Sequence, residues 1–316
     1  MAIDMHAHWL PEELHSAMQA DGLSPRKYDS LDERLSDMDA RSYSHAVLSC
    51  VDRAIESMPL AESLKYCRIY NDATAAACGA HPDRFSGLAS LPSADMEVMI
   101  EEFDHYMSMP GMVGAVLPGD GFLTLERAER YRPLFSAANQ MGALFLVHYG
   151  RLADDAEGAV QRYGDNRGLR TGSLDMQARL SQNMITFCLT DFLNDYPNVT
   201  VLSHNLGGNI TFEVERMDHR TLVDQPEGTE LPSSRLRSAR LLVDCNSFGA
   251  RGIEMAVAVY GAEKIVCGSD GTDFGMDWTN KALDEAHISE AERDLIREGN
   301  AMRVLAHGNS SLAVTP

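Results

Sequence analysis

The chain has 316 residues, and 47 aspartates and glutamates outnumber 27 lysines and arginines, which gives a formal net charge of −20. A surface that binds phosphate groups needs a basic excess, so we expect neither nucleic acid nor an anionic membrane as a partner. The composition is otherwise that of a globular protein, with 44% hydrophobic and 23% charged residues. This length allows two mid-sized domains or one large α/β domain.

Short aliphatic or β-branched runs alternate with longer segments of helical periodicity along the whole chain. The runs predict eight strands, at Ile3–His8, His45–Val51, Phe85–Leu91, Met112–Leu117, Ala143–His148, Val199–His204, Arg240–Cys245 and Lys264–Asp270. The segments between them predict helices, among them Pro59–Ala80, Ala94–Met107, Leu125–Met141, Leu174–Tyr196, Gly208–Leu222 and Gly252–Tyr260. Ser289 and Glu292 have the spacing of a capping box that begins a last helix, and Gly308 is placed to end it.

The strand cores are nearly all apolar (ALFLV, VTVLS, KIVCGS), which is typical of parallel strands covered by helices. Eight βα units predict a closed (β/α)8 TIM barrel with irregular loops at its C-terminal face, formed by one domain over residues 1–316. An open nucleotide-binding sheet would need a glycine-rich turn after its first strand, whereas this chain has HAHWLPEEL there.

Two segments that follow strands are predicted to be irregular, Arg151–Gly172 after the fifth strand and Gly271–His287 after the eighth. Active sites of barrels are built at the C-terminal ends of the strands, so these segments are candidate lids. Plain surface loops are the alternative. The polar stretch Asp224–Ser238 precedes a strand and is expected to be a spacer or a subunit contact.

The chain shows no signal for export or membrane insertion. Its first residues, MAIDMHAHWLPEEL, do not have a basic segment followed by a long apolar run. No stretch approaches the ~18 apolar residues that span a bilayer. The six cysteines are scattered without CxxC spacing, which is typical of reduced thiols. We therefore expect a soluble cytoplasmic protein.

Three histidines and one aspartate stand where the predicted strands end. His6 and His8 are two residues apart in the first strand, so their side chains share one face. His148 ends the fifth strand and Asp270 ends the eighth, which lies beside the first in a closed barrel. A single histidine at a strand end is usually a structural polar group, but these four predict a site for one divalent cation, zinc first, with an open position for water.

A second metal ion is not expected. Two-metal hydrolases on this scaffold need a bridging lysine or glutamate at the end of the fourth strand, and the chain has Leu117 and Pro118 there. Asp120 is close but follows a Pro-Gly turn.

The motifs IDMHAH, FLVHYG, VTVLSHNLGG, IVCGSDGTDFG and EGNAMRVL resemble the amidohydrolase superfamily. Within it they are most similar to the branch typified by 2-amino-3-carboxymuconate 6-semialdehyde decarboxylase, from Ile3 to about Leu305. The resemblance implies a (β/α)8 barrel with zinc, or sometimes manganese. It also implies four metal ligands and an acid/base histidine. The ligands fall on His6, His8, His148 and Asp270, and the acid/base histidine falls on His204.

We assign His204 and Asp270 as catalytic residues of a mononuclear, non-oxidative decarboxylase of a small aromatic or unsaturated carboxylic acid. A metal-bound water and His204 would then exchange protons with the substrate. The alternative is a hydrolase of an amide, lactone or C–C bond that uses the same residues. A barrel that binds metal without catalysis is the third possibility.

Residues that bind the substrate are less well defined by the sequence. Trp9, Tyr149, Phe274 and Trp278 are candidates for an aromatic pocket, although each could instead be packing. The resemblance places one substrate-binding arginine near Arg26. It places a second, supplied by a neighbouring subunit, near Arg220, which would make the active form a homodimer.

The chain also departs from the family pattern beside the predicted metal ligands. Tyr149 and Gly150 replace Pro-Trp, and Asn205–Gly208 replaces a run of small residues. These changes put the muconate-semialdehyde substrate itself in doubt. We expect the acidic residues to lie on the outer helices and the strand C-terminal mouth to be neutral or positive.

Overall fold

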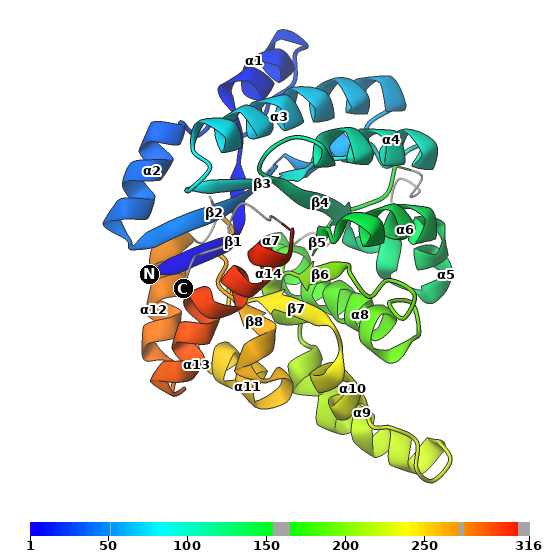
Figure 1. Cartoon of the computed structure of the whole chain (residues 1–316). Coiled ribbons are helices and arrows are strands. Elements are labelled where there is room, and N and C mark those ends of the chain that lie inside the picture. Colours follow the sequence, from blue (N-terminus) through cyan, green and yellow to red (C-terminus); the bar gives the residue numbers. More distant parts are fainter. Residues whose placement is uncertain (51, 154–164, 272–274, 309–316) are drawn as a thin grey trace.

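The computed structural model describes residues 1–50, 52–153, 165–271 and 275–308, and it contains a parallel eight-stranded sheet in the order β1 to β8 (Figure 1). The strands are β1 (Ala2–Trp9), β2 (Tyr43–Cys50), β3 (Phe85–Ala89), β4 (Met112–Pro118), β5 (Leu144–His148), β6 (Thr200–Ser203), β7 (Leu241–Asp244) and β8 (Ile265–Val266). The helices are α1 (Glu12–Ala20), α2 (Leu31–Ala40), α3 (Leu60–Ala80), α4 (Met96–Met107), α5 (Leu125–Ala128), α6 (Arg132–Met141), α7 (Arg167–Leu169), α8 (Met176–Leu189), α9 (Ile210–Asp224), α10 (Pro232–Ser238), α11 (Ala250–Tyr260), α12 (Gly275–Glu285), α13 (Glu290–Asp294) and α14 (Asn300–Gly308).

The sheet closes between β1 and the residues that follow β8. The amide of Met5 donates to the carbonyl of Cys267 at 2.9 Å, and the amide of Asp270 donates to the carbonyl of His6 at 3.0 Å. The predicted (β/α)8 barrel is therefore confirmed. The predicted eighth strand continues to Asp270, but regular pairing ends at Val266, because the next residues cross over to β1.

The barrel interior is filled with aliphatic side chains from the strands. They are Ile3, Met5, Val47, Leu88, Val113, Val116, Leu144, Leu146, Leu202, Leu242 and Val266. Ala301 and Leu305 of α14 belong to the same cluster, and Figure 1 shows α14 crossing the strands. The last helix thus covers the N-terminal end of the barrel, which leaves the C-terminal end for a site.

An irregularity in β1 decides which of its side chains face the interior. Ile3 and Met5 join the interior cluster, whereas Ala7 and Trp9 join the outer core between strands and helices. Strict alternation would keep odd-numbered residues on one side, so the inward face changes parity within the strand. The pairing with β2 shifts register between Asp4 and Ala7, as in a β-bulge. This shift is what allows His6 and His8 to face the interior.

Of two predicted helices, one is divided and the other is shorter in the structure. Leu125–Met141 is divided into α5 and α6, because Pro133, near the start of α6, has no amide hydrogen to extend a helix through this point. The predicted helix Leu174–Tyr196 ends at Leu189, after which Thr190 has an extended backbone. The predicted capping box is confirmed, with Ser289 and Glu292 bonded to each other's backbone amides at the start of α13.

The predicted irregular segment after the eighth strand is largely wrong. Residues 275–285 form α12, which buries Met276, Thr279 and Leu283 at helical spacing. Gly275 begins α12 with a positive φ, and in the sequence a glycine at this point is typical of a loop. In the segment after the fifth strand, residues 154–164 lie outside the described part of the chain, and residues 170–175 are helical. The stretch predicted as a spacer contains α10.

Candidate metal centre and active site

The four predicted metal ligands come together at the C-terminal ends of β1, β5 and β8. The Nε2 atom of His8 lies 3.2 Å from Nε2 of His6 and 3.1 Å from Nε2 of His148. One carboxylate oxygen of Asp270 lies 3.4 Å from Nε2 of His6 and 3.3 Å from Nε2 of His8. All four ligand atoms lie within 4.8 Å of one another. Ligands ~2.0–2.2 Å from one ion at ~90–110° to each other have separations of about 3.0–3.5 Å, so the cluster fits a single metal ion.

The remaining ring nitrogens of the three imidazoles have partners that orient the rings. Nδ1 of His6 lies 2.9 Å from a carboxylate oxygen of Asp244, and Nδ1 of His148 lies 2.8 Å from the carbonyl of Tyr149. Nδ1 of His8 lies 3.0 Å from the hydroxyl of Ser49. An acceptor at Nδ1 holds the proton there and leaves the Nε2 lone pair directed at the cluster. The donor set therefore suits a borderline dication.

The pKa values show that most of these groups are ready to bind a cation at neutral pH. Burial lowers the pKa of His8 and, together with neighbouring imidazoles, holds the pKa of His148 well below its usual value. Burial opposes ionisation of Asp270, but the hydrogen bond from His8 and the nearby imidazoles outweigh it and lower the pKa to about 2. His6 differs: burial opposes its protonation, but the charge and hydrogen bond of Asp244, together with the charges of Asp270 and Asp4, outweigh burial and raise its pKa.

The predicted acid/base residue, His204, lies against this cluster. Its ring stacks on that of His148, with centroids 4.1 Å apart and an interplanar angle of 19°. The backbone amide of Tyr149 donates to Nε2 of His204 at 2.9 Å, which places the imidazole proton on Nδ1. Nδ1 is buried and has no hydrogen-bond partner among the described residues. Burial and the charge of His6 hold the pKa of His204 well below its usual value, so the ring is neutral.

Two buried carboxylates that the sequence analysis missed hold the ligands in place. Asp4 accepts hydrogen bonds from the amide of His6 at 3.2 Å and from the amide and hydroxyl of Ser269, the residue before a ligand. Asp244 bonds to His6 through one oxygen, and through the other it accepts from the amide of Asn205, the residue after the acid/base histidine. The sequence feature that could have identified Asp4 and Asp244 is an acidic residue inside an otherwise apolar strand.

A third missed residue, Arg53, lies just after β2. Its side chain is 10% exposed and forms an ion pair with the buried carboxylate of Glu56. Nη2 of Arg53 lies 3.7 Å from the position that a Cβ on Gly150 would take, two residues after the ligand His148, so the guanidinium lies close to the cluster. After burial and the neighbouring imidazoles, its positive charge also lowers the pKa values of His148 and His204. Nη1 of Arg53 is buried without a hydrogen-bond partner among the described residues. A buried guanidinium with one free corner beside a metal centre can bind a carboxylate.

The predicted substrate-binding residues lie in different places. Tyr149 follows a metal ligand directly and is half-buried, so it adjoins the cluster. Trp9 is 4% exposed and donates its indole N–H to the carbonyl of Asp29, as a packed core residue does. The structure thus brings Tyr149 to the site and places Trp9 in the outer core.

The other aromatic and cationic candidates lie farther out. Trp278 of α12 is 41% exposed and donates to the carbonyl of Phe248. Arg220 of α9 has a side chain that is 73% exposed and pairs with Asp224. Phe274 lies outside the described residues. The structure therefore does not bring Trp278 or Arg220 to the cluster within this chain.

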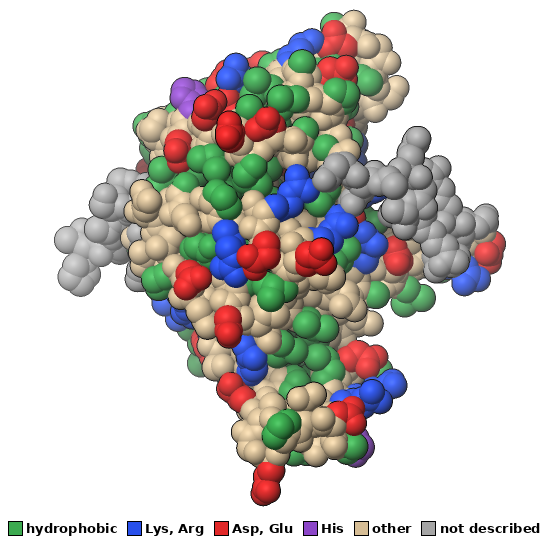
Figure 2. All heavy atoms as spheres, turned by 90° about the vertical axis from the view of Figure 1, so that its right-hand side faces the viewer, with side chains coloured by type: hydrophobic (Ala, Val, Ile, Leu, Met, Phe, Trp, Pro, Cys, Tyr) green, Lys and Arg blue, Asp and Glu red, His purple; other side chains and the backbone are tan. Residues whose placement is uncertain are grey.

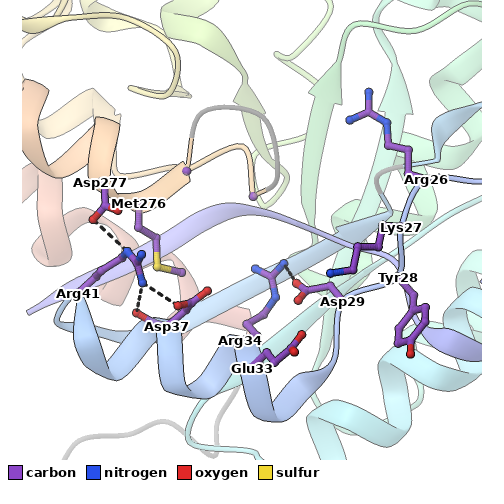
Figure 3. Close-up of a pocket in the computed structure, with 12 residues that line it drawn as sticks. Arg26, Lys27, Tyr28, Asp29, Glu33, Arg34, Asp37, Arg41, Met276 and Asp277 are labelled. Atoms are coloured by element: carbon purple, nitrogen blue, oxygen red, sulfur yellow. Dashed lines mark hydrogen bonds and ion pairs between the residues drawn. The ribbon is translucent and has the colours of Figure 1, made fainter.

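Arg26 lines a depression of about 440 Å³ next to the metal centre. Gly271, the residue after the ligand Asp270, is part of its wall. Figure 3 shows the guanidinium of Arg26 pointing away from the Arg34–Asp29 ion pair. Arg34 also donates to the carbonyl of His8 at 2.6 Å, so this ion pair supports a ligand.

The depression is balanced in charge. Its cations are Arg26, Lys27, Arg34 and Arg41, and its acids are Asp29, Glu33, Asp37 and Asp277. This agrees with a mouth that is neutral or positive. On the face drawn in Figure 2, acidic side chains are spread over the outer surface with basic ones between them. The field at the cluster is therefore set by nearby groups, not by the net charge of the chain.

A (β/α)8 barrel with a three-histidine, one-aspartate cluster at its strand ends defines a class of metal-dependent enzymes. Residues 3–306 match the sequence model of the amidohydrolase family, and the chain belongs to this family. It is an enzyme of the amidohydrolase superfamily. The predicted resemblance is confirmed.

Curated and solved relatives have names that agree in reaction type. A gamma-resorcylate decarboxylase of Rhodococcus jostii (strain RHA1) is 25% identical over 298 residues, which cover 89% of each chain. A dihydroxybenzoic acid decarboxylase of Polaromonas sp. JS666, solved with manganese and the inhibitor 2-nitroresorcinol, has a TM-score of 0.76 at 18% identity and covers 99% of each chain. A 5-carboxyvanillate decarboxylase of Sphingomonas paucimobilis has a TM-score of 0.76 at 18% identity, with 96% of this chain and 98% of that chain covered.

Proposed function

We propose that this enzyme is a mononuclear metal-dependent decarboxylase that releases CO2, without an oxidant, from a small aromatic or unsaturated carboxylic acid. The observation that carries the proposal is the cluster of His6, His8, His148 and Asp270, whose ligand atoms lie within 4.8 Å of one another. The names of the relatives, which are decarboxylases of aromatic acids, support the reaction type.

The four clustered side chains would hold the ion, which would supply Lewis acidity to polarise an oxygen of the substrate and stabilise developing charge. Arg53 would bind the substrate carboxylate through Nη1, the corner that Glu56 leaves free. Tyr149 would line the pocket beside the ring of the substrate. These contacts would fix the reacting carbon near His204.

Decarboxylation requires a proton on the carbon that carries the carboxylate, after which the C–C bond breaks and its electron pair returns to the ring system. We propose His204 and Asp270 as the groups that move this proton. For His204 the exchange would pass through Nδ1, since Nε2 is held by the amide of Tyr149. A neutral, buried imidazole carries its proton at Nδ1 and can direct that proton at the substrate as charge develops.

Zinc is the ion we propose, with manganese as the alternative. Three imidazole nitrogens favour zinc, while manganese is present in the dihydroxybenzoic acid decarboxylase neighbour. We propose a homodimer, in which the exposed Arg220 could reach the site of a second subunit. We also propose a single domain and a cytoplasmic location. All six cysteines are free and buried, as in a reducing compartment. None of the described helices is long and apolar enough to cross a membrane.

The test is CO2 release from a panel that includes 2,6-dihydroxybenzoate and 5-carboxyvanillate, with metal-loaded and metal-free protein. We expect release that requires the metal and falls at least a hundredfold in His204→Asn. Arg53→Gln should raise KM strongly, and Arg26→Gln tests separately the candidate arginine that lines the depression next to the metal centre. Turnover of amides or lactones without any CO2 from the panel would contradict the proposal and favour a hydrolase.

A further inference from the structure

A second cavity lies at the end of the barrel opposite the metal centre. It has a volume of about 390 Å³ and adjoins the N-terminal ends of β6, β7 and β8 and the helix α14. Arg240, Lys264 and Arg303 line it, and Glu263 is the acidic residue of its wall. Leu241 and Val304 contribute apolar surface. The lining therefore carries an excess of positive charge in a chain whose net charge is −20.

Two of these cations are held in place without being neutralised. Nη2 of Arg240 donates to the carbonyl of Leu193 at 2.7 Å, and Nζ of Lys264 donates to the carbonyl of Ala239 at 2.7 Å. Neither side chain forms an ion pair with a carboxylate of the described residues. Neutral carbonyl groups fix the direction of a cation but leave its charge available to an anion.

The surroundings of Lys264 point the same way. Burial lowers the pKa of Lys264. The charge of Glu263 raises this pKa, and the positive charge of Arg303 lowers it again. A negative ligand in the cavity would relieve this repulsion. The volume is within the ~300–1,000 Å³ range of small-molecule pockets and exceeds the needs of a bare inorganic ion.

We propose that this cavity binds a small organic dianion, either a phosphate ester or a short dicarboxylate, with Arg240 and Lys264 as its principal contacts. Both candidates carry two negative charges on oxygen atoms, either on one phosphate group or on two carboxylates. The apolar wall of Leu241 and Val304 would receive the organic part. This proposal is independent of the reaction at the metal centre.

The experiment is calorimetric titration of the zinc-loaded full chain with inorganic phosphate and, separately, with succinate, at constant ionic strength maintained with chloride. We expect saturable one-to-one binding of at least one of the two anions, and the comparison shows which anionic group is preferred. Lys264→Gln and Arg240→Gln should each weaken binding at least fivefold. Lys264→Arg, which keeps the charge, should retain it. Lys281→Gln, with the same charge change at an exposed position of α12, should have no effect.

Two results would overturn the proposal. One is the absence of saturable binding of both anions. The other is binding that survives in Lys264→Gln and Arg240→Gln but is lost when the metal is removed, because that would locate the anion at the metal centre. The two variants remove different carbonyl contacts, so either one that folds, as judged by circular dichroism, is sufficient to decide.

Discussion

The carboxylate of Asp4 should determine how tightly the metal centre is held, although Asp4 is not a ligand. It is fully buried and accepts three hydrogen bonds, from the amide of His6 and from the amide and hydroxyl of Ser269. These contacts tie the bulge in β1 to the residue that precedes the ligand Asp270. Replacing Asp4 should therefore loosen ligands from two strands at once.

The size of the effect follows from these contacts. Asp4→Ala would leave three buried donors without a partner, each at about 1–3 kcal/mol. Removing the carboxylate also removes the cost of burying it, which is the main cause of its raised pKa. We expect a net loss of about 2–4 kcal/mol in the free energy of unfolding and a loss of about 10–100-fold in metal affinity. Asp4→Asn keeps one oxygen for the two amides and should cost about 1 kcal/mol.

The assay combines urea unfolding of the metal-free protein with competition for zinc against a chromophoric chelator. Glu102→Ala is the matched control, because Glu102 is also a buried carboxylate, bonded to Arg68 far from the cluster. It should lower the free energy of unfolding but leave the metal affinity unchanged. If Asp4→Ala lost stability and yet bound zinc as tightly as the wild type, our account of Asp4 as a positioning residue would be wrong.

Three further predictions concern the metal and the backbone around it. Metal binding must displace the proton of His6, whose pKa is raised chiefly by Asp244 against burial, so zinc affinity should fall as the pH drops through this raised pKa. Asp244→Asn should move the midpoint to lower pH in a chelator titration and weaken binding about 10–100-fold. Chelating the metal should lower the thermal unfolding midpoint of the wild type, since the ion binds only the folded chain, and re-addition should restore it. Gly208→Ala should lower the free energy of unfolding in urea by more than about 2 kcal/mol, because φ is +83° and the new Cβ would lie 2.2 Å from the carbonyl oxygen of Gln177. Gly228→Ala is the control: its φ is +87°, but no atom lies within 4 Å of the new Cβ, so it should cost about 1 kcal/mol.

The barrel and its ligands could be predicted from the sequence because both depend on local pattern. Apolar runs at regular spacing indicate strands, and a polar residue at the end of such a run is placed at the mouth of the barrel. His148 and Asp270 follow this rule. His6 and His8 also end their strand, but they face the interior only because β1 shifts register, and nothing in the run IDMHAH indicates the bulge.

The residues that support the ligands could not be predicted, because their partners are far away in the chain. Asp244 reaches His6 across 238 positions, and Asp4 reaches Ser269 across 265. A buried acid in an apolar strand indicates that some partner exists, but not which one. Arg53 was missed for a related reason, since a charged residue after a strand is common and its burial becomes visible only when Glu56 is packed against it.

The metal ligands can be located from the sequence more accurately than the substrate contacts, because the two sets of residues belong to different structural elements. The histidine ligands sit on β1 and β5, and Asp270 is fixed beside β1 by its amide hydrogen bond to His6, so the barrel sets their depth and an error of one residue in a predicted boundary does not move them from the mouth. Arg26, Trp278 and Arg220 belong to loops and outer helices, where a single turn redirects a side chain. The indole N–H of Trp9 and that of Trp278 each bond to a backbone carbonyl, which anchors the two rings in different parts of the protein. Arg53 lies only three residues past the end of β2, and this closeness to a strand is the physical reason to test it before Arg26 as the carboxylate contact.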